Sequence, residues 1–65
     1  MIVVKKNSQT ECTVDCQTFS EAMAIKQSVI VVRPTHNPLV FKAWGRWNDF
    51  KSDMNKKKIS VCFKN

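Results

Sequence analysis

The stretch from Asn37 to Lys58 constrains the fold of this chain more than any other segment. It contains both tryptophans, two of the four phenylalanines and most of the positive charge. Asn37 can cap the start of a helix, and Pro38 suits the first helical position, where a missing N–H costs nothing. Helical spacing places eight apolar side chains on one side: Leu39, Val40, Phe41, Ala43, Trp44, Trp47, Phe50 and Met54. The stretch therefore predicts one amphipathic helix whose two tryptophans face the core.

A second interpretation divides the same stretch at Gly45. Leu39 to Trp44 can form a strand that turns at this glycine, because valine, phenylalanine and tryptophan favour sheets. The helix accounts for all eight apolar positions, whereas the strand accounts for about half of them. The helix is therefore the preferred prediction, and the strand remains the alternative.

Two segments near the N-terminus have the composition of strands. Ile2–Lys5 is short and rich in β-branched residues, and Lys6–Gln9 has the composition of a turn. Glu11–Cys16 alternates, with Cys12, Val14 and Cys16 on one face. Together these segments predict a β-hairpin.

A capping box predicts the start of a helix after the hairpin. The Thr18 hydroxyl can accept the N–H of Glu21, while the Glu21 carboxylate can accept the N–H of Thr18. The residues that follow are good helix formers, so we expect a helix from Phe19 to about Gln27.

Two further apolar runs predict strands in the rest of the chain. Val29–Val32 is continuously apolar and is typical of a central strand covered on both faces, which Pro34 ends. Ile59–Phe63 alternates and predicts a last strand. Sixty-five residues suffice for a single domain, here residues 1–65. The predicted fold is α+β, a small mixed four-stranded sheet with two helices in the order β-β-α-β-α-β.

The N-terminal segment and the cysteines indicate where the protein acts. The first apolar run has three residues and its charges follow it, which differs from a signal peptide, and no window is long enough for a membrane span. Three cysteines cannot form a complete disulfide framework, so we expect reduced thiols. These features predict a soluble protein of the cytoplasm that does not enter membranes.

Two arrangements of reactive side chains are possible, and the sequence favours neither. Cys12, Cys16, Cys62 and His36 could supply zinc ligands, but a strand separates Cys12 and Cys16 by about 13 Å. A Cys–His nucleophile needs an oxyanion hole, and the chain has one glycine. We expect no enzymatic activity, no metal and no cofactor.

The positive charge is concentrated in the second half of the chain. The formal net charge is +6, and the charges of residues 1–32 cancel, so the excess lies in residues 33–65. This asymmetry favours an acidic protein surface or nucleic acid as the partner. The apolar arc is wider than one sheet requires, so its aromatic edges are expected to stay partly exposed. The predicted partner-binding residues are Arg33, Phe41, Lys42, Arg46, Phe50, Lys51, Lys56, Lys57 and Lys58.

One segment of the chain resembles a known family. Val14–Ala24, followed by a strand that ends Val32-Arg33-Pro34, is similar to a pattern in the small RNA polymerase inhibitors of T7-like phages. The resemblance covers about a third of the chain, which continues beyond that strand with a further helix and strand. It implies a phage-encoded, non-enzymatic protein that occludes a host enzyme, with Arg33 as a contact.

Taken together, the sequence predicts a binding protein. The leading hypothesis is a phage-type regulator or inhibitor that docks its basic and aromatic surface on an acidic face of a larger host protein. RNA polymerase or another nucleic-acid-processing enzyme is the expected target. The alternative is a small basic protein that binds DNA or RNA directly.

Overall fold

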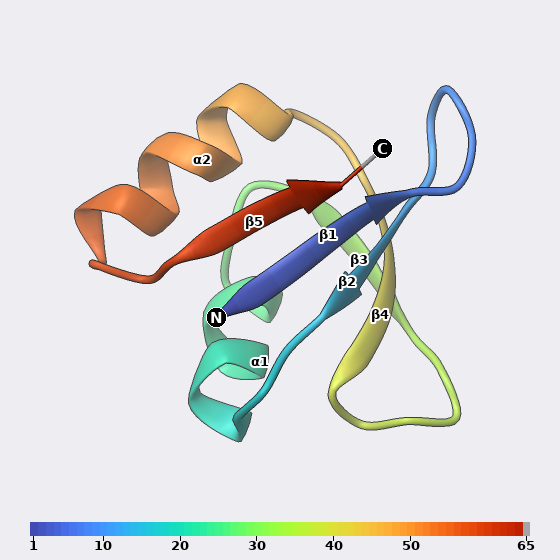
Figure 1. Cartoon of the computed structure of the whole chain (residues 1–65), viewed down its shortest axis with the longest axis horizontal. Helices are drawn as coiled ribbons and strands as arrows, with labels where there is room; N and C mark the ends of the chain where they lie inside the picture. Colours follow the sequence, from blue (N-terminus) through green and yellow to red (C-terminus); the bar gives the residue numbers. More distant parts are fainter. Residues whose placement is uncertain (65) are drawn as a thin grey trace.

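The computed structural model describes residues 1–64 and contains five strands and two helices (Figure 1). Their order is β-β-α-β-β-α-β. The elements are β1 (Ile2–Lys6), β2 (Cys12–Asp15), α1 (Phe19–Lys26), β3 (Val31–Pro34), β4 (Val40–Trp44), α2 (Trp47–Lys56) and β5 (Val61–Lys64). The α+β class is confirmed, with one strand more than predicted.

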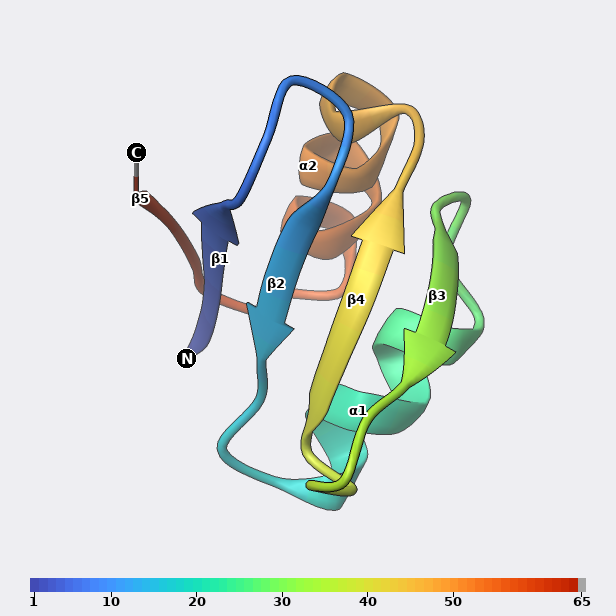
Figure 2. The same ribbon diagram turned by 90° about the vertical axis from the view of Figure 1, so that its right-hand side faces the viewer.

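The strands form a single mixed sheet in the order β3-β4-β2-β1-β5. β1 pairs with β2 antiparallel and with β5 parallel, and β4 pairs antiparallel with both β2 and β3. Figure 2 shows the strands in front of α1 and α2, so both helices lie on the same side of the sheet. None of the described helices covers the opposite face, which we call the open face.

The core lies between the sheet and the two helices. Alternate residues of a strand point to opposite faces, so β1 contributes Ile2 and Val4 to the covered side. α1 contributes Ala22 and Ile25, whereas its Phe19 side chain is 69% exposed. The buried residues are Ile2, Val4, Val14, Cys16, Ala22, Ile25, Ile30, Phe41, Ala43, Phe50 and Met54.

The start of α1 confirms the predicted cap. Thr18 is extended, and its Oγ1 accepts the N–H of Glu21 at 3.2 Å. The Glu21 carboxylate accepts the N–H of Gln17 at 2.7 Å, one residue earlier than the capping box predicts, and the N-terminal ammonium at 2.8 Å. These bonds fasten the N-terminus of the chain to the helix.

The predicted long helix is wrong in its first half. Residues 40–44 form β4, which confirms the alternative interpretation, and α2 begins only at Trp47. Asn37 caps a turn instead of a helix, since its Oδ1 accepts the Leu39 N–H at 2.9 Å and its C=O accepts the Val40 N–H at 3.0 Å. Gly45 then turns the chain with a φ of 137°, a conformation that favours glycine. Pairing on both sides of β4 prevails over the helical spacing.

The expected position of the strand at Val29–Val32 is also wrong. β3 spans Val31–Pro34 at an edge of the sheet, with β4 as its only described neighbour. Val29 and Val31 are 55% and 62% exposed, so the run is not covered on both faces. Its terminal proline lacks an N–H, which suits an edge strand better than a central one.

Candidate functional site

A row of positively charged side chains crosses the open face of the sheet. The register pairs Lys64 with Lys5, Lys5 with Thr13, Thr13 with Lys42, and Lys42 with Arg33. These residues alternate with those that enter the core, so they share the face away from the helices. At the usual strand spacing the row is roughly 19 Å long. We call Lys64, Lys5, Lys42 and Arg33 the cation row.

An aromatic side chain lies beside one end of the cation row. The Arg33 guanidinium is 5.7 Å from the centre of the Trp44 ring, a cation–π distance. Trp44 is half-buried and pairs across the sheet with Val31. A hollow of about 500 Å³ opens here, and Arg33, His36, Lys42 and Trp44 help to line it. This end of the row therefore offers positive charge, an aromatic surface and room for a ligand group.

Two carboxylates moderate the charge of the open face. Glu11 Oε1 lies 4.0 Å from Lys42 Nζ, and the 57% exposure of the lysine side chain makes this a weak pair. Asp15 lies on the same face, opposite Val3 and Val40. The four cations outnumber these two acids, so the face keeps a positive balance.

The nine predicted partner-binding residues do not form one surface. Arg33 and Lys42 lie in the cation row. The other five charged residues lie on α2 or beside its ends, on the side of the sheet that the helices cover (Figure 2): Arg46, Lys51, Lys56, Lys57 and Lys58. Segregation of charge along the sequence therefore does not produce a single basic surface in space.

Several cations of α2 have local structural roles. Lys57 Nζ lies 3.2 Å from Asp53 Oδ2, and Arg46 lies 4.0 Å from Asp49 across an exposed turn. Lys56 is in the last turn, where a cation complements the negative end of the helix dipole. Lys51 Nζ lies 4.5 Å from the centre of the Phe63 ring. Four of the five cations on or beside α2 therefore have a role within the chain and do not require a binding partner to explain them.

The expectation that Phe41 and Phe50 remain partly exposed is wrong. Phe41 is 2% exposed because β4 directs it under the helices, and Phe50 is 0% exposed because α2 directs it onto the sheet. Trp47 packs against the core, as predicted, and its ring also meets the Phe50 ring edge to face. Trp44 was expected in the core and instead lies on the open face.

The three cysteines are free thiols. Burial, together with the nearby carboxylates of Glu21 and Asp15, raises the pKa of Cys16 to about 11. Burial also raises the pKa of Cys12. At neutral pH both side chains are therefore protonated and poorly nucleophilic. Within residues 1–64, no three histidine, cysteine, aspartate or glutamate side chains gather as metal ligands do.

The sequence did not predict that Lys5, Lys64 and Trp44 lie on the same open face of the sheet. The alternation of Ile2 and Val4 with Lys5 was a usable signal, since it places Lys5 opposite the core. Joining these residues to Lys42 and Arg33 requires the strand order, which residue spacing does not give.

Comparison with protein families, with curated proteins and with solved structures found no significant match to this chain. Among the described helices, neither is long and apolar enough to cross a bilayer.

Proposed function

We propose that this chain is a non-enzymatic binding protein that holds single-stranded nucleic acid against the open face of its sheet. The observation that carries the proposal is the cation row, which places one charged residue in each of four strands at the same level of the sheet. Lysine and arginine side chains bind phosphates and release condensed counterions, which supplies affinity for any sequence.

Trp44 favours a single strand over a duplex. Its ring lies beside Arg33 at the hollow on the open face, where an unpaired base can stack on it. Stacking of this kind is worth about 1–3 kcal/mol per base and tolerates every base. The bases of a duplex are stacked on one another, so only its phosphates can use this face.

Fluorescence anisotropy with a labelled oligothymidylate of about 15 nucleotides tests the proposal at about 50 mM salt. We expect saturable binding that is weaker for the matching duplex. The double variant Lys5→Gln/Lys42→Gln should weaken binding at least about tenfold, whereas Lys56→Gln/Lys57→Gln removes equal charge from α2 and should change it little. Absence of binding by the wild-type protein, or an equal loss in both variants, contradicts the proposal.

A second candidate function is a phage-type regulator or inhibitor acting in the cytoplasm of a host cell. It would dock the same face on an acidic surface of a nucleic-acid-processing enzyme such as RNA polymerase. The adjacent Arg33 and Trp44 favour it, because these two residue types dominate the energetics of protein interfaces. Arg33 is also the contact that the family resemblance implies. Burial of Phe41 and Phe50 removes the other aromatic anchors, so this candidate ranks second.

Pull-down from bacterial lysate, with and without nuclease treatment, distinguishes the two candidates. Under the second candidate, the wild-type protein retains a stoichiometric partner that the Arg33→Glu variant does not retain. If only nucleic acid is recovered, and nuclease treatment removes it, the first candidate is supported and the second is contradicted.

A further inference from the structure

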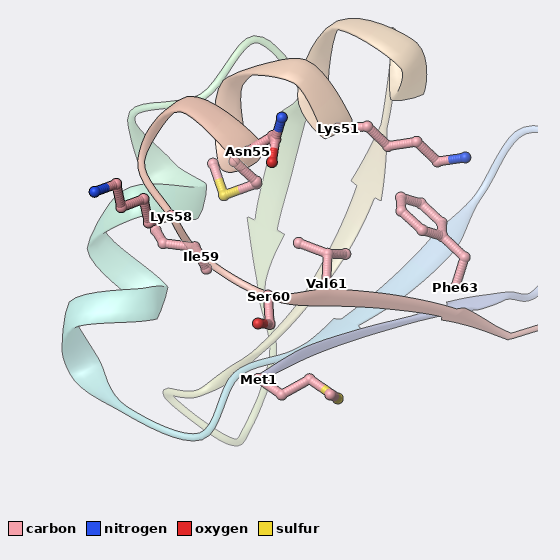
Figure 3. A pocket seen from close by; sticks show the side chains of 9 residues that line it. Met1, Lys51, Asn55, Lys58, Ile59, Ser60, Val61 and Phe63 are labelled. Atoms are coloured by element: carbon pink, nitrogen blue, oxygen red, sulfur yellow. The ribbon is translucent and has the colours of Figure 1, made fainter.

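A groove lies between α2 and β5, apart from the open face of the sheet. The groove there has a volume of about 820 Å³, and Figure 3 shows the side chains that line it. Ile59 and the β5 residues Val61 and Phe63 supply apolar surface above the buried Met54 of α2. On the helix side, Lys51 and Lys58 line the same groove. The groove thus combines apolar walls with two cations.

The backbone of β5 is available along this groove. Among the described strands, β5 has β1 as its single neighbour, so its other edge is unpaired. The Ile2 N–H donates to the Ser60 C=O at 2.9 Å, which turns the backbone groups of Ser60 toward β1. Successive residues of a strand direct these groups to opposite sides. The N–H and C=O groups of Val61 and Phe63 therefore point away from β1.

Val61 and Phe63 thus contribute to recognition in two ways. Their side chains point toward α2 and line the groove (Figure 3), while their backbone groups offer two donors and two acceptors at the sheet edge. Phe63 is 38% exposed, and the Lys51 ammonium lies 4.5 Å from the centre of its ring. An extended peptide that pairs with this edge would place alternate side chains in the groove.

We propose that β5 and the groove bind an extended segment of another protein whose groove-facing side chains include both apolar and acidic residues. The segment adds a sixth strand beside β5, and every second side chain faces the groove, where apolar side chains contact Val61 and Phe63 and carboxylates pair with Lys51 and Lys58. A second copy of this chain does not fit, because symmetric pairing would bring these lysines against one another. The proposal concerns a different surface from the nucleic-acid face and does not depend on it.

Binding of a designed peptide tests this proposal on the full-length protein. The probe is a capped, fluorescent peptide of about eight residues in which every second residue, on the face toward the groove, is glutamate or valine and the residues between them are threonine. Its anisotropy is followed with increasing protein. We expect saturable binding that weakens at least about fivefold when the two backbone nitrogens facing β5 are methylated, since methylation removes the ladder donors. The same peptide with lysine in place of each glutamate should bind at least about tenfold more weakly.

Variants of the protein test whether the peptide binds at β5 and the groove. Val61→Pro removes an N–H that points away from β1, so it leaves the sheet intact and should weaken binding at least about fivefold. Lys51→Glu/Lys58→Glu should weaken binding further, whereas Arg33→Glu/Lys42→Glu on the open face makes the same change of charge and is the matched control. Circular dichroism checks that each variant is folded. Failure of the glutamate–valine peptide to bind, or binding that is insensitive to methylation and to both groove variants, overturns the proposal.

Discussion

Replacing Phe50 tests whether this residue is a core residue, as the structure shows, or a partner contact, as the sequence predicted. Its side chain is 0% exposed, and its ring meets Trp47 at 5.6 Å and Phe63 at 6.4 Å between centroids, both edge to face. Truncating a buried phenylalanine to alanine costs about 3–5 kcal/mol. A domain of this size has a total stability of roughly 3–5 kcal/mol, so Phe50→Ala should be largely unfolded at 25 °C.

Phe50→Leu should cause a smaller loss of stability, which can be measured because the protein stays folded. Leucine retains most of the buried area, so the packing change should cost less than about 1.5 kcal/mol. The two lost aromatic contacts add about 0.5–1.5 kcal/mol each, so the total lies between about 1 and 4.5 kcal/mol, and its central value is about 2–3 kcal/mol. Urea unfolding followed by circular dichroism should show a midpoint lower by about 1–3 M, for a slope of about 1–2 kcal/mol/M.

Phe19 is the matched control for this prediction, because it is the same residue type with 69% exposure. Phe19→Ala should change the free energy of unfolding by no more than about 0.5 kcal/mol. If Phe50→Ala unfolds at the wild-type midpoint, or if both substitutions cost the same, Phe50 is not buried as described.

Three further predictions concern single residues. The N-terminal ammonium and the Gln17 N–H lower the pKa of Glu21 in the folded protein. The stability from these bonds is therefore present above the pKa of the unfolded state and is lost as the pH falls through the pKa of the folded state. Thermal melts should show less acid sensitivity for Glu21→Gln than for the wild type. Cys16 is 3% exposed and its pKa is raised to about 11, so iodoacetamide should alkylate it more slowly than Cys62. Mass spectrometry after brief treatment measures both rates, and equal rates in the folded protein contradict the burial of Cys16. Gly45→Ala should lower stability by about 1–3 kcal/mol in urea titrations, because φ is 137° and a Cβ would lie 3.2 Å from the Ile30 Cα; an unchanged midpoint would exclude this turn.

Local chemistry explains the elements that the sequence predicted. Thr18 and Glu21 lie three residues apart, so the cap of α1 depends on neighbours along the chain and could be predicted from the sequence. The alternation of Ile2 and Val4 likewise identified β1 and its buried face. The confirmed elements are those whose signals lie within one segment.

The stretch from Leu39 to Trp44 shows where such signals fail. Its apolar residues satisfy both a helical and a strand period, and Gly45 marks the boundary without excluding either. Pairing of β4 with β2 and β3 decides between them, and the paired residues lie 25–31 positions away in β2 and 7–13 positions away in β3. A spacing rule cannot weigh contacts of this kind.

The candidate site depends on long-range pairing to an even greater degree. Lys5 and Lys64 lie at opposite ends of the sequence and become neighbours because β1 pairs with β5 in parallel. Arg33 and Lys42 were predicted as contacts, but the sheet order joins them to Lys5 and separates them from the lysines of α2. Counting charge along the chain identified a basic protein, and the topology determines which cations act together.

The salt dependence of binding tests the cation row most directly. For single-stranded nucleic acid, the logarithm of the binding constant falls with the logarithm of the salt concentration by about 0.7 for each phosphate that is neutralised. Four cations predict a slope of about −2.8 for the wild-type protein and about −1.4 for Lys5→Gln/Lys42→Gln. A slope that is the same in both proteins would show that the open face of the sheet does not hold the phosphates.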